Sequence, residues 1–352
     1  MAQSSKNGSA RVRYPRGRDT SDGSLPSRSY LATVFGRVGW DEEAEFYGRR
    51  LDENVPAVIA RGEPGYSRID YARAAAAWTV ADHFRGAYSW EKLGGSPAGT
   101  TGGDKPLSLS PAKMSEEIKR AARTYGADLV GIAALDRRWV YAAERDGTPV
   151  EIPVSHMRAV VMAIAMDPDA IQASPSFVAA AAVGVGYSRM AFAIACLAEF
   201  IRSLGFRAIP MGNDTALSIP LAIDAGLGEL GRHGLLVTRE YGPCVRICKV
   251  FTDMPLTPDE PVSSGLATTC RSCQKCADAC EVGAISRDPE PSFEIVCRSN
   301  NPGIKRWAVD HDKCYCFWIE NGQDCSTCIA ACPFTRRGAR VTGRTWGAST
   351  GT

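Results

Sequence analysis

A group of four closely spaced cysteines near the C-terminal end constrains this chain more than any other feature. The group, Cys270-x2-Cys273-x2-Cys276-x3-Cys280, has a spacing that binds a [4Fe–4S] cluster. The first three thiolates can surround one face of a cubane, and the helix that follows carries the fourth toward a second cluster. The spacing therefore predicts a cluster-binding region and implies that a second cluster lies nearby.

A second cysteine group, Cys325-x2-Cys328-x3-Cys332-Pro333, repeats the latter half of this spacing. With two such groups, the last cysteine of each ligates the other cluster. We expect one cluster on Cys270, Cys273, Cys276 and Cys332, and another on Cys280, Cys314, Cys325 and Cys328. Cys316 competes with Cys314 as the fourth ligand, and because alternate strand positions point opposite ways, only one should reach the cluster. Zinc sites and surface thiols are the alternatives that the spacing disfavours.

Length and composition are those of a soluble globular protein. The chain has 352 residues, 45% of them hydrophobic and 23% charged, which suffices for a full core and a small additional domain. The net charge of +2 implies no nucleic-acid or membrane partner. Free thiols beside clusters indicate a reducing compartment, and the N-terminus lacks the apolar segment of a secretory signal. We expect a cytoplasmic protein, or one associated with a membrane through a partner if a leader is missing from the sequence.

Changes in composition divide the chain into five segments. Residues 1–28 are rich in Ser, Gly and Arg and are expected to be a disordered N-terminal tail. Residues 29–112 are rich in aromatic side chains and are expected to form an extension that contributes to a pocket. We expect a ligand-binding core over residues 113–260, a cluster domain over 261–335 and a C-terminal tail over 336–352.

The predicted core alternates helices and strands. Ser110-Pro111 is a helix start, and Gly126 ends that helix. Further helices are predicted at residues 177–204, read as a buried helix, and 217–225. Apolar runs predict strands at residues 128–135, 159–166, 206–210, 234–238 and 245–252. This order is typical of a layered α/β or α+β fold.

One glycine-rich segment lies within the predicted core, ahead of the cysteine groups. It runs from Gly226 to Gly234 and also contains Gly228, Gly231 and His233. Glycines at this density let the backbone approach a large ligand closely, and successive N–H groups can face its polar atoms. The spacing matches neither the dinucleotide-binding fingerprint nor the P-loop.

Several segments together resemble the reductive dehalogenases, which share a cobalamin- and iron–sulfur-dependent superfamily with the epoxyqueuosine reductases. Besides the glycine-rich segment, they are Asn213-Asp214-Thr215, Tyr241-Gly242-Pro243, Arg246-x-Cys248, Lys249 to Asp253 and Asp312-x-Cys314-Tyr315-x-Phe317-Trp318. The resemblance covers roughly residues 115–335. It implies a nitroreductase-like core that binds a base-off corrinoid (cobalamin), followed by a bacterial-type ferredoxin domain with two [4Fe–4S] clusters. The glycine-rich segment, His233 included, would then contact the corrinoid.

The resemblance also implies three polar residues on the substrate side of the cobalt. Tyr187 would be the proton donor, flanked by Asn213 and Arg246. Replacing a carbon–halogen bond by carbon–hydrogen needs two electrons and one proton, so a low-potential metal is paired with a weak acid. A phenol near an arginine suits this task, because the cation favours the phenolate left after proton transfer.

Two rival functions remain open. Epoxyqueuosine reductases carry Asp-Tyr-His around the equivalent tyrosine, whereas this chain has Gly186-Tyr187-Ser188. A ferredoxin-type electron carrier without catalytic activity would bind iron but no cobalt. For the dehalogenase, the resemblance implies an organohalide substrate, a low-potential electron donor such as a ferredoxin, a flavodoxin or a reductase, and a small membrane-anchor protein as a further partner. No nucleic-acid partner is expected.

Overall fold

The structure is a computed structural model. It describes residues 29–83, 106–143, 147 and 149–335. The two predicted tails, residues 1–28 and 336–352, lie outside this part of the chain.

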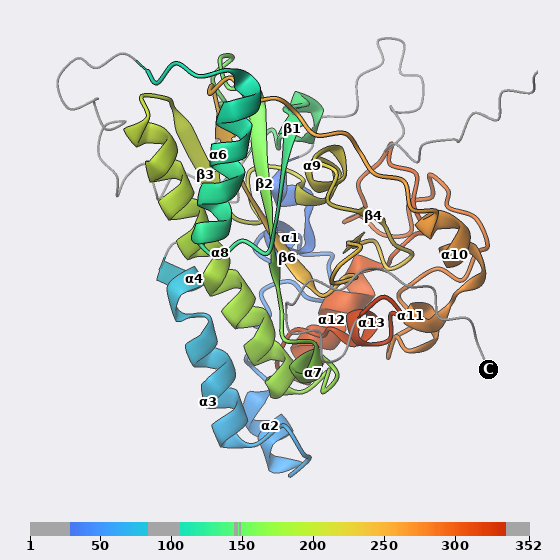
Figure 1. The fold of residues 1–352 in the computed structure, drawn as a ribbon. Coiled ribbons are helices and arrows are strands. Elements are labelled where there is room, and N and C mark those ends of the chain that lie inside the picture. The colour runs from blue at the N-terminus through green and yellow to red at the C-terminus, as the bar shows by residue number, and fades with distance from the viewer. Residues whose placement is uncertain (1–28, 84–105, 144–146, 148, 336–352) are drawn as a thin grey trace, which may run out of the picture.

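A four-stranded antiparallel sheet forms the centre of the fold (Figure 1). Its strands, in spatial order, are β1 (Leu129–Ala134), β2 (Arg158–Ala165), β6 (Val245–Thr252) and β3 (Ala208–Met211). Val160 in β2 lies opposite Ile132 in β1 and Val250 in β6. The predicted strands at these places are confirmed, and the antiparallel pairing makes the core α+β.

Helices cover both faces of the sheet. They are α6 (Pro111–Thr124) and α8 (Phe177–Ser203) on one face, and α9 (Ser218–Asp224) on the other (Figure 1). Met162 of β2 belongs to the apolar cluster of α6 and α8, whereas Val161 belongs to that of α9. Neighbouring residues of β2 thus face opposite layers, as the alternation of side chains along a strand requires. The strand is therefore apolar from Ala159 to Ala165.

The ends of α6 lie where the sequence predicts them. Ser110 Oγ accepts a hydrogen bond from the backbone N–H of Lys113 at 3.3 Å. Gly126 follows the last turn with φ +95°, a conformation that favours glycine.

The long helix α8 is apolar enough to cross a membrane by length and composition. Its most apolar window is 56% buried inside the fold, where Met190, Ile194 and Leu197 pack on the sheet. The core helix of a globular domain has these properties, and the prediction of a buried helix is confirmed.

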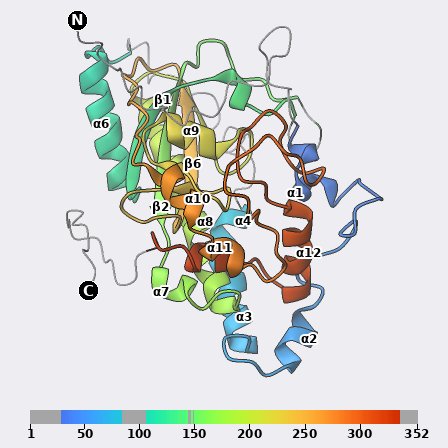
Figure 2. The same cartoon turned by 90° about the vertical axis from the view of Figure 1, so that its right-hand side faces the viewer.

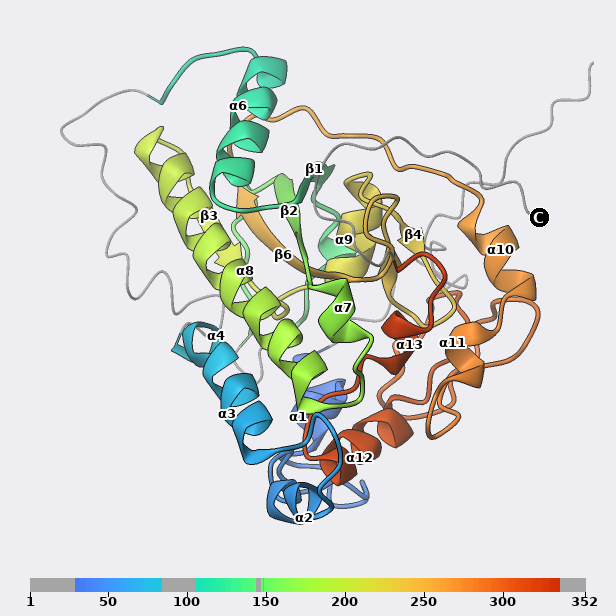
Figure 3. The same cartoon turned by 60° about the horizontal axis from the view of Figure 1, so that its bottom comes forward.

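The N-terminal extension packs along α8 and the cysteine-rich region. Its elements are η1 (Tyr30–Ala32), α1 (Val34–Arg37), α2 (Val55–Ala60), α3 (Arg68–Ala77) and α4 (Thr79–His83). Helix α3 runs beside α8 (Figure 3). Phe177 packs edge-on against Tyr66 and Tyr71. Buried Arg37 of α1 reaches the cysteine-rich region, where it pairs with Asp312 at 2.7 Å.

The cysteine-rich region consists of short helices joined by loops beside the sheet (Figure 2). The helices are α10 (Leu266–Ser272), α11 (Lys275–Asp278), α12 (His311–Asn321) and α13 (Thr327–Ala330). A small hairpin of β4 (Glu229–Leu230) and β5 (Leu236–Val237) joins it to the core, so the strand predicted at 234–238 is shorter than expected. The remaining elements, η2 (Arg137–Trp139) and α7 (Pro168–Ile171), flank β2 in the sequence.

Candidate functional site

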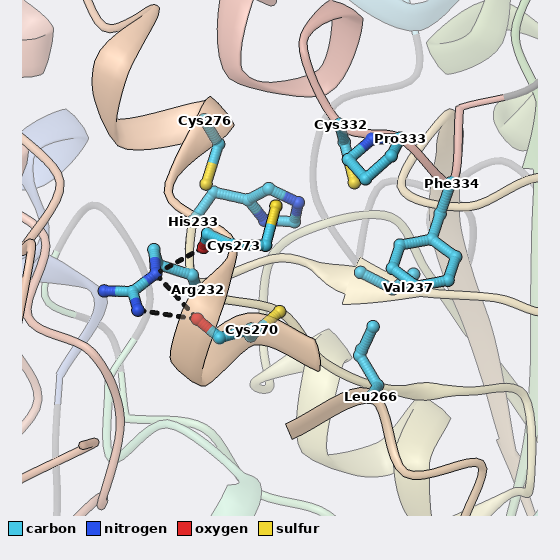
Figure 4. A pocket seen from close by; sticks show the side chains of 10 residues that line it. All are labelled: Arg232, His233, Val237, Leu266, Cys270, Cys273, Cys276, Cys332, Pro333 and Phe334. Atoms are coloured by element: carbon cyan, nitrogen blue, oxygen red, sulfur yellow. Dashed lines mark hydrogen bonds between the residues drawn. The ribbon is translucent and has the colours of Figure 1, made fainter. Parts of the chain in front are cut away.

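Four of the predicted ligands line one cavity. Cys270 and Cys273 come from α10 and its end, Cys276 from α11, and Cys332 from the loop after α13 (Figure 4). Burial raises the pKa of the Cys276 thiol to about 12 and that of Cys332 to about 11. Metal binding must therefore supply the free energy that deprotonates these thiols. The arrangement fits the predicted first cluster.

Arg232, which the sequence analysis did not single out, holds this cavity together. Its guanidinium donates to the carbonyl oxygens of Cys270 at 2.6 Å and Cys273 at 3.0 Å (Figure 4). It also donates to the carbonyl oxygens of Ser286 and Asp288, each at 2.8 Å. The side chain is 1% exposed and lies over the ring of Trp307. One buried cation thus fixes several loops of the cysteine-rich region.

The other four predicted ligands form a second thiol group. Burial, with the neighbouring thiols of Cys325 and Cys280, raises the pKa of Cys314 to about 12. Burial and the same group of thiols raise the pKa of Cys328 well above its usual value. Backbone N–H groups of Ala284 and Thr327 donate to the sulfurs of Cys280 at 3.3 Å and Cys325 at 3.4 Å. Such bonds are one of the means by which proteins set a cluster's potential.

Cys316 lies away from this group. It packs among Val34, Phe46 and Ile319, and burial raises the pKa of its thiol to about 11. Cys314 and Cys316 both lie on a helix, α12, so the strand argument used to separate them is wrong. Residues two apart on a helix still point in different directions, because each residue turns the chain by about 100°. The geometry places Cys314 with the thiol group, and its role as ligand stays a prediction.

Single-ion sites have a different geometry from either thiol group. Within the described residues, no group of three or more His, Cys, Asp or Glu side chains is arranged to hold one metal ion. The ligands of a cubane lie farther apart than those of a single ion such as zinc, because each thiolate binds a different corner.

The three predicted catalytic residues come together from separate elements. Tyr187 lies on α8, Asn213 follows β3, and Arg246 lies on β6. Asn213 Nδ2 donates to the Tyr187 hydroxyl at 3.4 Å, and the Arg246 guanidinium lies 5.2 Å from the Tyr187 ring centre. Tyr187 is half-buried, and Asn213, which bonds its hydroxyl, is exposed. Their catalytic roles stay predictions.

Trp78 completes the surroundings of the tyrosine. Its ring stacks on Tyr187 with centres 4.7 Å apart and planes at 27°. A Cβ at Gly184 would come within 2.7 Å of the Trp78 ring, so the glycine makes room for the stack. The sequence did not predict this role for Trp78, because nothing near it in the sequence indicates contact with a residue so distant in the chain.

The tyrosine and the second thiol group share one apolar cluster. Met166, Val183 and Cys244 form its buried part, with Tyr187 and Cys328 packed against it. Asp324, next to Cys325, is also buried; burial raises its pKa to about 6, and the Arg246 guanidinium opposes that shift. The polar residues and the second thiol group are therefore neighbours.

The backbone of the glycine-rich segment lies close to other backbone segments of the same protein. A Cβ at Gly226 would lie 2.6 Å from the carbonyl oxygen of Glu260, and one at Gly228 would lie 2.3 Å from that of Val237. His233 lines the first thiol cavity, and burial lowers its pKa to about 4. These contacts explain at least two of the glycines without a ligand. Corrinoid contact by Gly226, Gly228, Gly231, His233 and Gly234 stays a prediction.

Comparison with known families defines the class of protein. Residues 269–335 match the 4Fe-4S dicluster domain, and residues 133–256 match the family described as reductive dehalogenase subunit. The cysteine-rich region is therefore an iron–sulfur domain for two [4Fe–4S] clusters, attached to an α+β core.

Individual relatives agree with these matches. The tetrachloroethene reductive dehalogenase of Desulfitobacterium hafniense is 36% identical over 293 residues, covering 71% of this chain and 53% of the relative. That of Sulfurospirillum multivorans is 34% identical over 326 residues, covering 81% and 64%. An epoxyqueuosine reductase of Listeria monocytogenes is 31% identical over 123 residues, covering 34% and 29%.

Solved structures of similar fold are also reductive dehalogenases. The catabolic reductive dehalogenase NpRdhA superposes with a TM-score of 0.70 at 25% identity, covering 89% of this chain and 42% of that chain. A reductive dehalogenase described as B12-dependent superposes with a TM-score of 0.69 at 24% identity, covering 90% and 42%. The chain contains a domain of the reductive dehalogenase family over residues 133–256. It spans about half the length of the curated Desulfitobacterium relatives that it matches.

Proposed function

We propose that the protein is a reductive dehalogenase that replaces carbon–halogen by carbon–hydrogen in an organohalide. The observation that carries the proposal is the meeting of Tyr187, Asn213 and Arg246 beside the second thiol group. The net reaction consumes two electrons and one proton and releases a halide ion. The clusters supply the two electrons, and the Tyr187 phenol supplies the proton.

The residues present fit a base-off corrinoid held in a nitroreductase-like core. Among the described residues, Arg246 Nε is buried without a hydrogen-bond partner, and the guanidinium lies over the ring of half-buried Tyr187. An unpartnered buried donor calls for a polar ligand. When bound, the corrinoid supplies a low-potential cobalt that accepts electrons and activates the carbon–halogen bond. The glycine-rich segment is the proposed contact for its periphery.

Each polar side chain has a role in the proposed reaction. Tyr187 gives its hydroxyl proton to the carbon that loses the halogen. Arg246 stabilises the negative charge that remains on the phenol oxygen, and the Asn213 amide donates to the same oxygen. Trp78 keeps the phenol ring in place by stacking on it.

Electrons enter through the two clusters that the eight cysteines bind. We propose that Cys270, Cys273, Cys276 and Cys332 hold the cluster nearer a low-potential donor, such as a ferredoxin, a flavodoxin or a reductase. Cys280, Cys314, Cys325 and Cys328 then hold the cluster nearer the substrate, because Cys328 and Tyr187 pack against one apolar cluster. A cytoplasmic location, or attachment to a membrane through a small anchor protein, belongs to the same proposal.

Gly186 separates this proposal from epoxide reduction. The rival reaction places an aspartate before the tyrosine as proton donor. A Cβ at Gly186 would lie 3.0 Å from Arg246 Cγ and 3.3 Å from Met166 Cγ, so an aspartate here would displace Arg246. The geometry therefore favours a tyrosine donor.

Halide release tests the proposed function. The cluster-loaded protein is incubated anaerobically with cobalamin, a low-potential reductant and tetrachloroethene, on which the named relatives act. A brominated alkane and a chlorinated phenol extend the test to other organohalides. Chloride or bromide release that requires both protein and cobalamin supports the proposal, and none from any of the three substrates contradicts it.

A further inference from the structure

Lys249 of β6 is a buried cation that is linked to Tyr187 by a series of hydrogen bonds. Its side chain is 0% exposed, and its ammonium donates to the carbonyl oxygens of Gly212 at 2.9 Å and Asp214 at 3.0 Å. It also donates to Ser218 Oγ at 3.0 Å. A lysine ammonium has three hydrogens and no acceptor, so these bonds run in one direction only.

Ser218, the first residue of α9, continues the series of hydrogen bonds in the same direction of donation. Its oxygen accepts from Lys249, and its single hydroxyl hydrogen points to Asn213 Oδ1 at 3.2 Å. A hydroxyl that accepts from an obligatory donor has its hydrogen left for another acceptor. The serine is 7% exposed, so water seldom competes for either bond.

Asn213 is oriented as a result. An amide has an acceptor end and a donor end that are nearly equal in shape, so neighbours decide which way it faces. With Oδ1 held by Ser218, Nδ2 faces the Tyr187 hydroxyl at 3.4 Å. This bond is long, as hydrogen bonds in active sites without substrate often are. In the reverse orientation, Oδ1 would accept the phenol hydrogen and hold it away from the substrate.

We propose that Lys249 and Ser218 are positioning residues that act through Asn213 to keep the Tyr187 hydroxyl hydrogen free for transfer. Donation runs from Lys249 to Ser218, then to Asn213, then to the phenol oxygen. The phenol oxygen thus receives a hydrogen bond, and its own hydrogen is not used by this series of hydrogen bonds, which ends at the phenol oxygen. The inference rests on the proposed function, in which Tyr187 is the proton donor.

A purely structural role is the competing explanation. Lys249 also binds two carbonyl groups of the loop at 212–214, and the next residue, Thr215, has φ 65°. The ammonium could serve only to hold this loop. Ser218 separates the explanations, because Ser218→Ala leaves the Lys249 bonds to both carbonyls in place and removes the hydroxyl that joins Lys249 to Asn213.

The test compares Ser218→Ala and Ser218→Thr in the full cluster- and corrinoid-loaded protein. Ser218→Ala is expected to lower kcat by about tenfold with little change in KM, because substrate binding does not need the oriented hydrogen. Ser218→Thr keeps the hydroxyl and is expected to restore kcat. Ser115→Ala is the matched control: Ser115 is equally buried at 7%, and it accepts from the N–H of Thr257 at 2.8 Å in a different part of the core. Its kcat is expected to equal that of the wild type.

A second readout does not depend on turnover. The side-chain amide signal of Asn213, assigned by its loss in Asn213→Asp, is followed by NMR in ¹⁵N-asparagine-labelled, cluster-loaded protein. Tyr187→Phe is expected to shift this signal in the wild-type background and to leave it unmoved in Ser218→Ala. Equal kcat in Ser218→Ala and the wild type, or an equal amide response in both backgrounds, would overturn the proposal. If the wild type releases no halide, the proposed function fails, and the amide response alone decides whether the hydrogen-bond chain exists.

Discussion

The guanidinium of Arg246 lies over the ring of Tyr187, 5.2 Å from its centre. A cation over an aromatic face is attracted to the ring, and it becomes a stronger partner when the oxygen carries negative charge. In the proposed reaction, Arg246 would therefore act after proton transfer. Arg246 lies on β6 and is also near Asp324, which neighbours the second thiol group, so one side chain lies between Tyr187 and that thiol group.

Replacing the phenol by a benzene ring tests the proton donor. Tyr187→Phe keeps the stack on Trp78 and the contact with Arg246 but removes the acidic hydrogen. Loss of a general acid is expected to lower kcat by at least about 100-fold, while iron and cobalt contents stay at wild-type values. Tyr125→Phe, at the end of α6 and away from the site, is the control and should retain full halide release. Turnover above a tenth of wild type in Tyr187→Phe would remove Tyr187 from the mechanism.

Iron content distinguishes the proposed ligands from the other cysteines. Cys276→Ala and Cys314→Ala should each lose about half of the iron, since each removes a ligand from one of two clusters. Cys316→Ala is the matched control, because that thiol lies on the same helix as Cys314 but packs among apolar side chains. It should keep all of its iron. Iron loss in Cys316→Ala together with full retention in Cys314→Ala would reverse the assignment.

Arg232 should be required for the first cluster. Arg232→Met removes a buried guanidinium that binds carbonyl groups of Cys270, Cys273, Ser286 and Asp288. Because these carbonyls lose their donors while buried, the cysteine-rich region should be destabilised by about 3 kcal/mol or more. The expected result is loss of about half of the iron, measured beside the exposed-site control Arg239→Met. Full iron content in Arg232→Met would show that the loops hold without it.

Burial of His156 predicts a loss of stability on the acid side. Burial lowers its pKa below 6.5, and the ring is 1% exposed with Nε2 unpartnered among the described residues. Below pH 6.5 the unfolded chain therefore binds a proton that the folded chain excludes, so stability is retained above this pH and lost as the pH falls beneath it. Melting temperatures of the wild type and His156→Gln should run parallel between pH 7.5 and 8.5. Between pH 6.5 and 5.5 the wild type should fall more steeply; parallel curves there would contradict the assignment.

Local sequence signals predicted the elements of the fold well. The cap at Ser110, the glycine at 126 and the apolar run of β6 each depend on a few neighbouring residues. The spacing of the cysteines is equally local, and the structure gathers the thiols in the two predicted sets. The antiparallel order of the strands could not be read from apolar runs, since a strand covered on both faces is apolar in either kind of sheet.

Contacts between residues far apart in the chain could not be predicted from the sequence alone. Tyr187, Asn213 and Arg246 were found through family resemblance, whereas Trp78, Arg232 and the pair Lys249–Ser218 were missed. Each missed residue acts through a partner on another element, and an isolated Trp, Arg or Lys carries no pattern of its own. Cys314 and Cys316 show the same limit: a helix was taken for a strand, and only packing separates the two thiols.

Metal content tests the central claim most directly. The protein is purified anaerobically with added cobalamin, and cobalt and iron are measured together. A corrinoid-dependent reductase with two cubanes should contain one cobalt for about eight irons. About eight irons without cobalt would contradict the account and leave an electron-carrying iron–sulfur protein in its place.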